Sequence, residues 1–594
     1  MLFGKHVNKF YIKYGLFFLI GILALIAVDY FQLEIPNVIG SVIDGLNEES
    51  ITKEVLRGYI YQLLFIAAVM FAGRFLWRLC IFGNGVKIEC DLRNDLFSAM
   101  EKQSQKFFGE NKTGALMALY TNDLNMVRNC FGGGTIMLID SVCLGILTLV
   151  RMIQLNWILT IISLVTISII IIFAQIFEKG ITKATDENFK AYERLSDYVQ
   201  EDFSGISVVK AFVKEKLQVR RFQKYNKDNM DTCIEMVKVS VRLDTIIMII
   251  INAVFVLTII YASVLIYWHS IGKATEFTIG DLTKFIAYLD TLIWPVDAIG
   301  RLFQLRGKGK ASLGRIAHII DNELEVNDNL VDDQTKDVVN LVGEIEYRNL
   351  SFAYPGTKME SLKNVNFHIE KGEFVGIIGA TGSGKTTIVD LLLRTYNIDE
   401  GKVFVDGYDI MHLPLATVRN NIAYVPQDNF LFSDTVANNI AFSENGEIDR
   451  EKVENSAKLA DIYKDVEAFS DKLDTIMGER GVTVSGGQKQ RISIARALYK
   501  DANILILDDS LSAVDTETER EIIHNLRNIR KGRTTIIIAH RISTLQHLDK
   551  ILVVEEGEVT GIGTHDELLM TNKAYANEAR LQELEAEVGE RRER

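Results

Sequence analysis

The sequence is poor in cysteine and proline and has no concentrated run of basic residues. Among 594 residues there are 5 cysteines and 5 prolines. The cysteines are odd in number, form no C-x-x-C pair and all lie in the first half of the chain. This pattern argues against a disulfide framework or a zinc site and favours reduced thiols. Neither half carries a concentrated basic face, so nucleic acid is not an expected partner.

The amino-terminal segment lacks the features of a cleaved signal peptide. It has the basic lead of one, but the apolar run that follows is too long, and no small-residue cleavage site ends it. We therefore expect this segment to be retained as part of the folded protein.

Length and charge divide the chain into two unlike parts. A chain of 594 residues exceeds what one hydrophobic core supports, so at least two domains are expected. A hydrophobic content of 48% and a charged content of 24% exclude a disordered or collagen-like chain. Up to residue 322 there are 34 lysines and arginines against 30 acidic residues, a net charge of +4. The remainder has 31 against 48, a net charge of −17.

The first part contains apolar windows long enough to cross a membrane as helices, each about 20 residues. One such window alone is compatible with a buried helix of a soluble protein, but six within the first part exclude that interpretation. We therefore predict an all-α transmembrane domain of six helices over residues 1–322. The predicted spans are residues 14–35, 60–83, 132–153, 157–177, 243–268 and 282–303.

Positive charge near the span ends predicts the orientation in the membrane. Lys5, Lys9 and Lys13 precede the first span, and five lysines and arginines follow the sixth. The segment between spans two and three carries six, and that between spans four and five carries thirteen. Both termini are therefore expected in the cytoplasm. The two long internal segments, with little proline and sustained apolar periodicity, are expected to extend the helices into the cytoplasm.

A polar, acidic stretch over residues 323–341 is predicted to be the interdomain linker. Beyond it, in residues 342–594, strand-like runs such as FVGIIG, NILILD and TTIIIA alternate with helical patterns. This alternation predicts a parallel α/β core. The charged carboxyl terminus has only weak heptad character, and we interpret it as a solvated helical tail.

The strand-like run FVGIIG leads directly into a phosphate-binding loop. Residues 379–386 read G-A-T-G-S-G-K-T and are followed by a helical pattern, which is the context that makes G-x-x-x-x-G-K-[ST] specific. Backbone N–H groups of such a loop and the helix N-terminus bind phosphates, with the lysine on the β/γ-phosphates and the threonine on Mg²⁺. The predicted binding residues here are Gly379, Thr381, Gly382, Ser383, Gly384, Lys385, Thr386 and Thr387.

A second nucleotide motif lies downstream. The apolar run NILILDD ends in Asp508 and Asp509. A buried strand that delivers a carboxylate beside the phosphate loop is the Walker B arrangement, with Asp508 directed toward Mg²⁺. The alternative, an ordinary core strand with a polar end, is disfavoured because both motifs occur together.

The stretch GVTVSGGQKQRISIARAL, residues 481–498, resembles the signature motif of ABC transporter ATPases. Val484 stands where leucine is most usual. The residues that match the motif, and that the resemblance implies for nucleotide binding, are Ser485, Gly486, Gly487 and Gln488. The other family motifs follow in the expected order, and the expected ligands are accordingly ATP and Mg²⁺.

The resemblance assigns further single residues. Tyr354 in SFAYPG resembles the aromatic residue that stacks on adenine, and Gln427 in YVPQD the Q-loop glutamine, which approaches Mg²⁺ and senses the membrane domain. His540 in AHR resembles the switch histidine on the γ-phosphate. SAVD at residues 512–515 matches the D-loop, and GERG at residues 478–481 resembles the X-loop of exporter-type members.

The membrane half resembles the six-span exporter class as well. DLRNDLFSAMEKQSQKFFGENKTGALMALYTNDL and EDFSGISVVKAF are similar to its first and second cytoplasmic loops, and GKASLGRI to the exit from span six. Nearly the whole chain is thus covered as one half-transporter with fused membrane and nucleotide domains. No peptidase domain precedes the first span, which disfavours a processing peptide exporter. An importer is disfavoured because importers usually carry these domains on separate chains.

The sequence departs from the family pattern at one catalytic position. A glutamate that polarises the attacking water usually follows the Walker B aspartate, and here that residue is Asp509. Aspartate is one methylene shorter than glutamate, so its carboxylate lies roughly 1.5 Å closer to the backbone. A misplacement of a catalytic group by about 1 Å can cost on the order of 10²-fold in rate. Two interpretations remain: Asp509 is a slower base, or the site binds ATP but hydrolyses it poorly.

This departure bears on the partner. In the family, Walker motifs of one chain face the signature motif of another, and the signature motif here is intact. The pattern resembles one subunit of bacterial heterodimeric multidrug exporters, so a second half-transporter is the expected partner, with a homodimer as the alternative. The predicted catalytic residues are Asp509, His540 and Gln427, and the predicted metal ligands are Thr386, Gln427 and Asp508.

The cargo is less well indicated. Ionisable groups in spans face a cavity or one another, and Asp140 either attracts cationic drugs or makes an interhelical contact. The other ionisable residues noted in the spans are Arg74, Arg78, Asp290 and Asp297. Apolar spans without a coherent charged cluster suit amphipathic or lipid-like cargo. We expect multidrug export across a bacterial plasma membrane by alternating access, with lipid or lipopeptide export as the alternative.

Two other classes of protein fit less well. A soluble ABC ATPase acting on ribosomes or DNA is excluded by the six spans and the cytoplasmic loops. A regulatory or channel protein gated by ATP binding stays open because of Asp509, although no added regulatory domain is evident.

Overall fold

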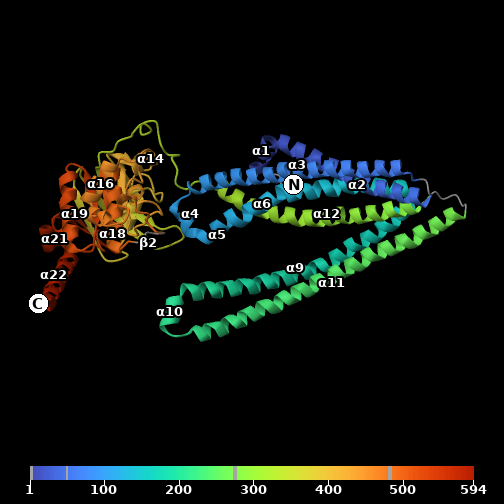
Figure 1. Cartoon of the computed structure of the whole chain (residues 1–594). Coiled ribbons are helices and arrows are strands. Elements are labelled where there is room, and N and C mark those ends of the chain that lie inside the picture. Colours follow the sequence, from blue (N-terminus) through green and yellow to red (C-terminus); the bar gives the residue numbers. More distant parts are fainter. Residues whose placement is uncertain (1–3, 49–50, 272–276, 479–483, 594) are drawn as a thin grey trace. The chain divides into compact units, whose positions relative to one another are not determined.

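The computed structural model describes residues 4–48, 51–271, 277–478 and 484–593 (Figure 1). They form two compact units. The first comprises residues up to Ser98 together with Gly114–Asp321, and the second comprises Ala99–Thr113 together with the chain from Asn322 onward. The second unit is therefore assembled from two separate stretches of sequence.

The first unit is helical. Each of the six predicted spans lies within helical segments, because long apolar runs with few prolines satisfy their backbone groups internally. The helices are α1 (Lys5–Lys13), α2 (Gly15–Asn47), α3 (Lys53–Met100), α5 (Thr113–Ala118), α6 (Leu124–Phe131), α7 (Gly133–Ile139), α8 (Gly145–Leu155), α9 (Trp157–Ser204), α10 (Ile206–Ala211), α11 (Glu215–Ser270) and α12 (Ile279–Ile320), with π-helical turns η1 (Leu119–Asp123) and η2 (Asp140–Leu144).

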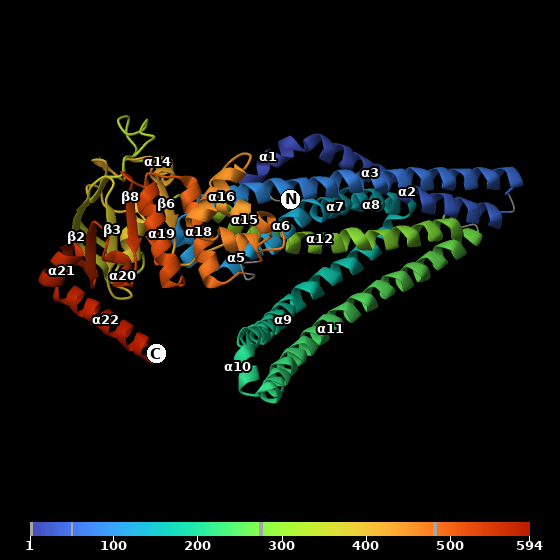
Figure 2. The same cartoon turned by 60° about the vertical axis from the view of Figure 1, so that its left-hand side comes forward.

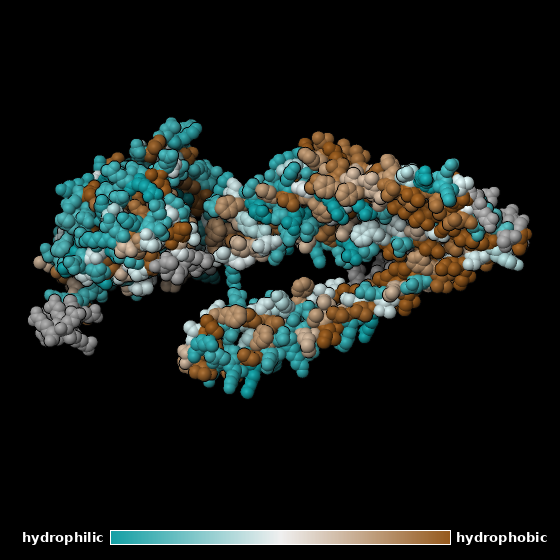
Figure 3. All heavy atoms as spheres, in the orientation of Figure 1, coloured by the Kyte–Doolittle hydropathy of each residue, from teal (hydrophilic) through white to brown (hydrophobic). Residues whose placement is uncertain are grey.

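Four helical stretches, counted over the described residues, are long and apolar enough to cross a membrane: Gly15–Asn47, Lys53–Met100, Thr113–Leu155 and Glu215–His269. The stretch Trp157–Thr166 of α9 is a shorter apolar helix. The apolar sequence of helix α12 is interrupted by charged residues such as Lys284 and Asp290. The count of six spans therefore stays a prediction. Hydrophobic side chains gather over the end of this unit where α11 and α12 meet (Figure 3).

Helices α2 and α12 cross closely because small residues lie at their contact. A Cβ on Gly280 would lie 2.4 Å from the carbonyl oxygen of Gly40, so glycine is required there. The N–H of Gly280 donates to Asp44 Oδ1 at 2.8 Å, and Tyr288 Oη donates to the carbonyl of Leu33 at 3.1 Å. These bonds join the two helices at several levels.

Helices α9 and α11 run side by side and diverge from the rest of the helical unit toward α10 (Figures 1 and 2). Tyr198 and Tyr225 stack with ring centroids 5.0 Å apart, and Arg194 pairs with Asp228 at 2.6 Å. Farther along α11 the surface is mixed. Met230, Ile234, Val237 and Val241 are exposed apolar residues, and they lie among Asn229, Lys238 and Arg242.

The second unit contains two sheets in its described part. The order β10-β9-β3-β8-β7-β6 is parallel except for β10, and β2-β1-β4-β5 is antiparallel. The parallel α/β core was predicted, whereas the antiparallel sheet was not. The strands are β1 (Ile345–Ala353), β2 (Glu360–Ile369), β3 (Phe374–Ile378), β4 (Val403–Val405), β5 (Tyr408–Asp409), β6 (Ile422–Val425), β7 (Ile504–Asp508), β8 (Thr534–Ile538), β9 (Lys550–Glu555) and β10 (Glu558–Gly563).

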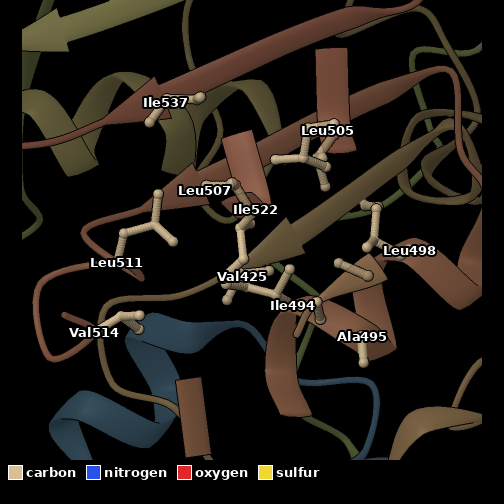
Figure 4. Close-up of a cluster of buried hydrophobic side chains, with 14 of the residues drawn as sticks. Val425, Ile494, Ala495, Leu498, Leu505, Leu507, Leu511, Val514, Ile522 and Ile537 are labelled. Atoms are coloured by element: carbon tan, nitrogen blue, oxygen red, sulfur yellow. The ribbon is translucent and has the colours of Figure 1, made fainter. Parts of the chain in front are cut away.

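Fully buried strands explain the uninterrupted apolar runs of this unit, since a parallel sheet is covered on both faces. One core packs β6, β7 and β8 against α18 and α19, with Val425, Ile494, Leu507 and Ile522 at its centre (Figure 4). The helices are α4 (Gln105–Glu110), α13 (Lys385–Leu392), α14 (Leu415–Asn421), α15 (Val436–Ile440), α16 (Arg450–Leu459), α17 (Tyr463–Glu467), α18 (Gly486–Lys500), α19 (Thr516–Ile529), α20 (Ile542–Leu545), α21 (His565–Thr571) and α22 (Lys573–Glu593), with a 3₁₀ turn η3 (Lys472–Asp474).

The acidic stretch over residues 323–341 forms neither helix nor strand, yet it is bonded to the second unit. Arg394 donates to the carbonyl of Asn327 at 2.8 Å, and Thr335 to the carbonyl of His412 at 2.6 Å. The separate stretch 99–113 joins it, since Lys106 pairs with Glu325 at 2.9 Å. These contacts hold residues 323–341 against the rest of the second unit.

Candidate functional site

The predicted phosphate loop connects β3 to α13. Gly379 cannot be replaced without a clash, because a Cβ there would lie 2.1 Å from the carbonyl oxygen of Val554. Gly384 has φ +105°, and a Cβ added there would lie 2.8 Å from the carbonyl oxygen of Ser361. The Ser383 hydroxyl is buried and has no hydrogen-bond partner within the described residues. A cradle closed by glycines and an unpaired buried hydroxyl fit a bound phosphate.

Lys385 begins α13 with its side chain folded over the loop. Its Nζ donates to the carbonyl oxygens of Gly379 at 2.8 Å and Ala380 at 2.9 Å. The residue is only 6% exposed, and burial lowers the pKa of Lys385, against the opposing charges of Asp508 and Asp509. A partly desolvated cation beside a phosphate cradle is suited to hold the β/γ-phosphates.

Asp508 lies at the end of the buried strand β7 and is 1% exposed. Burial raises the pKa of its carboxyl, and hydrogen bonds from the Thr386 and Tyr424 hydroxyls oppose that rise. Thr386, Gln427 and Asp508 together supply hydroxyl, amide and carboxylate oxygens. Such an oxygen donor set is the chemistry that Mg²⁺ prefers, so the residues present fit that ion.

Asp509 follows at φ +46°, a left-handed conformation that aspartate tolerates better than most residues. Its N–H donates to the carbonyl of Ile538 at 3.0 Å, which fixes it beside β8. Its carboxylate accepts from Gln427 Nε2 at 3.5 Å. Two of the three predicted catalytic residues, Asp509 and Gln427, are thus within reach of one another.

Tyr354 lies on the loop after β1 in an aromatic cluster. Its hydroxyl shares a hydrogen bond of 2.9 Å with that of Thr387, and its ring packs edge-on against Phe352 and Tyr396, with centroid distances of 5.3 Å. Burial raises the pKa of the Tyr354 hydroxyl. The cluster holds the tyrosine ring beside the phosphate loop, and stacking on adenine stays a prediction.

Most of these residues line one cavity of about 760 Å³, but Gly379 and Ser383 are not among its lining residues. The lining lies at the carboxyl ends of parallel strands, where ligands bind in such sheets. It is formed mainly by the phosphate loop and the start of α13 after β3, by the end of β7, and by the loops that follow β6 and β8. The predicted residues that line it are Tyr354, Thr381, Gly382, Gly384, Lys385, Thr386, Thr387, Gln427, Asp508, Asp509 and His540.

The signature residues are not part of this cavity lining. Ser485 caps α18, and a capping box joins it to Gln488, whose Nε2 also donates to Asp465 at 2.9 Å. A Cβ on Gly487 would lie 2.9 Å from the carbonyl of Ala513 in the D-loop. The predicted X-loop falls mostly on residues 479–481, which lie outside the described residues.

Sequence reasoning missed part of the lining. Ser361 on β2 and Gly557 in the turn between β9 and β10 belong to it, and the N–H of Gly557 donates to the Ser383 carbonyl at 3.0 Å. The Glu556–Gly557 pair is recognisable as a hairpin turn. Only the strand order β10-β9-β3 places that turn against the phosphate loop.

In the membrane unit, Asp140 makes an interhelical contact. Its Oδ2 accepts from the indole N–H of Trp294 on α12 at 2.8 Å. Asp297 pairs with Arg301 one turn away, Arg74 donates to Gln32 at 3.5 Å, and Arg78 lies over Trp77. Asp290 is exposed. The structure does not bring these residues together into one charged cluster.

Comparison with known proteins gives two family matches. Residues 18–296 match the ABC transporter transmembrane region, and residues 362–512 match the ABC transporter family. The chain is 36% identical over 581 residues to the probable multidrug resistance ABC transporter ATP-binding/permease protein YheI of Bacillus subtilis, covering 98% of this chain and 97% of that protein. This chain belongs to the ABC transporter family.

Other relatives extend the comparison. The ATP-dependent lipid A-core flippase of Salmonella typhimurium is 34% identical over 504 residues, covering 85% of this ABC transporter and 84% of the flippase. The structure of a bacterial Atm1-family ABC exporter with ATP bound matches the fold with a TM-score of 0.78, at 24% identity, over 97% of this chain and 98% of that one. The ABC transporter is thus an exporter-type half-transporter whose fused ATPase domain binds ATP and couples hydrolysis to transport.

Proposed function

We propose that this half-transporter moves amphipathic drugs or lipid-like compounds outward by alternating access. Two kinds of observation support the proposal. YheI carries the name of a probable multidrug resistance transporter. The candidate spans are apolar, and their described ionisable groups form small sets, such as the Glu34–Arg151 ion pair, rather than one large charged cluster. Residues 1–322 form the membrane domain, 323–341 the linker and 342–594 the nucleotide domain, which lies with both termini in the cytoplasm beneath a bacterial plasma membrane.

In this proposal each residue of the cavity has one role. Tyr354 stacks on adenine, Lys385 and the loop N–H groups hold the phosphates, and His540 contacts the γ-phosphate. Thr386, Gln427 and Asp508 hold Mg²⁺, which neutralises phosphate charge when bound. Ser485, Gly486, Gly487 and Gln488 complete the nucleotide site of a second chain.

We infer further that the second chain is a different half-transporter, and that this chain's own Walker site hydrolyses ATP poorly. The observation that carries this inference is Asp509, which stands where a longer glutamate is usual. Its backbone is fixed by the bond to Ile538, so the shorter side chain is not offset by a shift of the strand end.

The test is Mg²⁺-dependent ATPase activity in lipid, measured for this chain alone and together with a candidate partner half-transporter. The heterodimer predicts activity only with the partner, and that activity survives Asp509→Asn. Robust activity of the chain alone, abolished by Asp509→Asn, would instead establish a homodimer in which Asp509 is the base.

The alternative function is a homodimeric lipid or lipopeptide exporter, favoured by the similarity to the lipid A-core flippase. Reconstituted vesicles distinguish the two cargoes. Outward movement of a fluorescent phospholipid by the chain alone supports lipid export, whereas drug efflux that requires the partner supports the heterodimeric drug exporter.

A further inference from the structure

The carboxyl-terminal helix α22 reaches the segment that carries the switch histidine. Gln582 Nε2 donates to the carbonyl oxygen of His540 at 2.8 Å, and its Oε1 accepts from the N–H of Ile542 at 2.8 Å. One side-chain amide thus bridges the backbone on both sides of Arg541. We propose that Gln582 is a positioning residue, which holds this backbone so that the His540 side chain meets the bound nucleotide.

The segment needs such a partner. Helix α20 is a single short turn whose N-cap residue is Arg541, and no side chain caps it locally. The first N–H groups of a helix have no partner within it. Gln582 supplies an acceptor to Ile542 and at the same time a donor to the carbonyl of His540, which lies just beyond β8.

The orientation of the amide is determined by a third bond. Gln582 Nε2 also donates to Glu578 Oε1 at 2.8 Å. A flipped amide would place its oxygen against a carbonyl and a carboxylate and its N–H₂ against an N–H. Gln582 therefore acts as an acceptor through Oε1 and as a donor through Nε2. A glutamate at this position would keep the acceptor and lose the donor.

The opposite side of the segment is fixed separately. Arg541 donates to Glu519 Oε2 on α19 at 2.9 Å, and the Thr544 hydroxyl donates to the other oxygen of that buried carboxylate. Arg541 also reaches the carbonyl of Val514, in the D-loop, at 3.4 Å. Residues 540–544, which include His540, are thus held between α19 and α22.

Helix α22 is itself anchored where Gln582 needs it. Tyr575 is buried in the core, its hydroxyl lies 2.7 Å from His565 Nδ1, and Ala579 packs against the same core. Residues 575, 579 and 582 share one helix face because they are spaced at i, i+4 and i+7. Burial of the first two directs the third toward His540, so the start of the predicted solvated tail is in fact packed.

The inference rests on the proposed contact between His540 and the nucleotide. The first measurement is carbethoxylation of each histidine by diethyl pyrocarbonate, read by mass spectrometry on the full-length transporter in lipid, with and without Mg-ATP. We expect Mg-ATP to slow modification of His540 in the wild type and in the matched control Glu583→Ala. In Gln582→Ala and Gln582→Glu this protection falls by about ten-fold, the loss expected for a hydrogen bond or two.

A second measurement separates positioning from general loss of structure. Deuterium exchange of residues 540–546 without nucleotide is expected to rise in both Gln582 variants while the melting temperature and exchange at β7 stay unchanged. Protection of His540 by Mg-ATP that persists in Gln582→Ala overturns the inference alone. Absence of protection in the wild type overturns the proposed role of His540, and the positioning role falls with it.

Discussion

At the scale of single residues, Lys385 carries a charge that nothing else in the phosphate loop replaces. Its two bonds to loop carbonyls keep it in the cradle, and its partial desolvation strengthens its attraction for phosphate. Lys385→Ala is expected to weaken binding of a fluorescent ATP analogue to this chain's site by at least about ten-fold. Lys371→Ala, an exposed lysine before β3, is the control and leaves binding unchanged.

Asp390 on α13 is a second residue with a testable charge. Burial, aided by the charge of Asp508, raises the pKa of Asp390 from its usual 3.8 to about 6. The folded state therefore holds this proton more tightly than the unfolded state does. The resulting stabilisation is present below the unfolded pKa and is lost as the pH rises from about 4 to 6.

Asp390→Asn removes this penalty, because asparagine does not ionise. The variant is expected to melt roughly 2–4 °C above the wild type at pH 7.5, with most of the gain gone at pH 4.5. Differential scanning fluorimetry at the two pH values checks the prediction. An equal gain at both values would assign the effect to packing rather than to charge.

At the scale of elements, the start of α18 combines a cap with a proposed nucleotide contact. The Ser485 hydroxyl accepts from the N–H of Gln488 at 3.2 Å. Ser485→Ala is expected to cost about 1 kcal/mol of stability and also to lower ATPase activity at the partner's Walker site. Ser485→Asn keeps the cap, so thermal unfolding should recover while activity stays low. Recovery of both would show that capping is the residue's whole contribution.

The contact between η2 and α12 gives a second prediction, on the hydrogen bond between Asp140 and Trp294. Asp140 is 7% exposed, and the indole N–H of Trp294 donates to its carboxylate at 2.8 Å. Trp294→Phe is expected to destabilise the membrane domain by about 1–3 kcal/mol, because a buried carboxylate loses its hydrogen bond. The same change in an Asp140→Leu background should cost less, which a double-mutant cycle in detergent measures. An equal cost of Trp294→Phe in both backgrounds would show that Asp140 and Trp294 do not interact energetically.

The sequence predicts elements better than it predicts their neighbours. Apolar runs with few prolines located the membrane helices, and the loop between β3 and α13 was evident from its glycines. In the antiparallel sheet, which was not predicted, β4 and β5 are too short, at three and two residues, to give a periodic signal. Ser361, Gly557 and Gln582 escaped because each acts through a contact with residues far along the chain, which no local pattern encodes.

At the scale of the whole molecule, the proposed heterodimer makes the two nucleotide sites unequal. His540 belongs to the site that contains Asp509, so it serves the slower site. His540→Ala is expected to reduce transport less than the matching change in the partner, by about ten-fold or more. Drug efflux from reconstituted vesicles measures both variants side by side. Equal losses would contradict the asymmetry.

The division of the chain into two units has a practical consequence for anyone who isolates the ATPase. Residues 99–113 belong to its compact unit, although most of the membrane domain separates them from it in sequence. A fragment that begins at residue 322 loses the partner of Glu325 and uncovers a groove beside Tyr396 and Arg419, which residues 101–105 help to line in the intact chain. Inhibitors found by screening such a fragment would include molecules that occupy the place of residues 101–105, and these molecules would compete with that segment in the intact transporter.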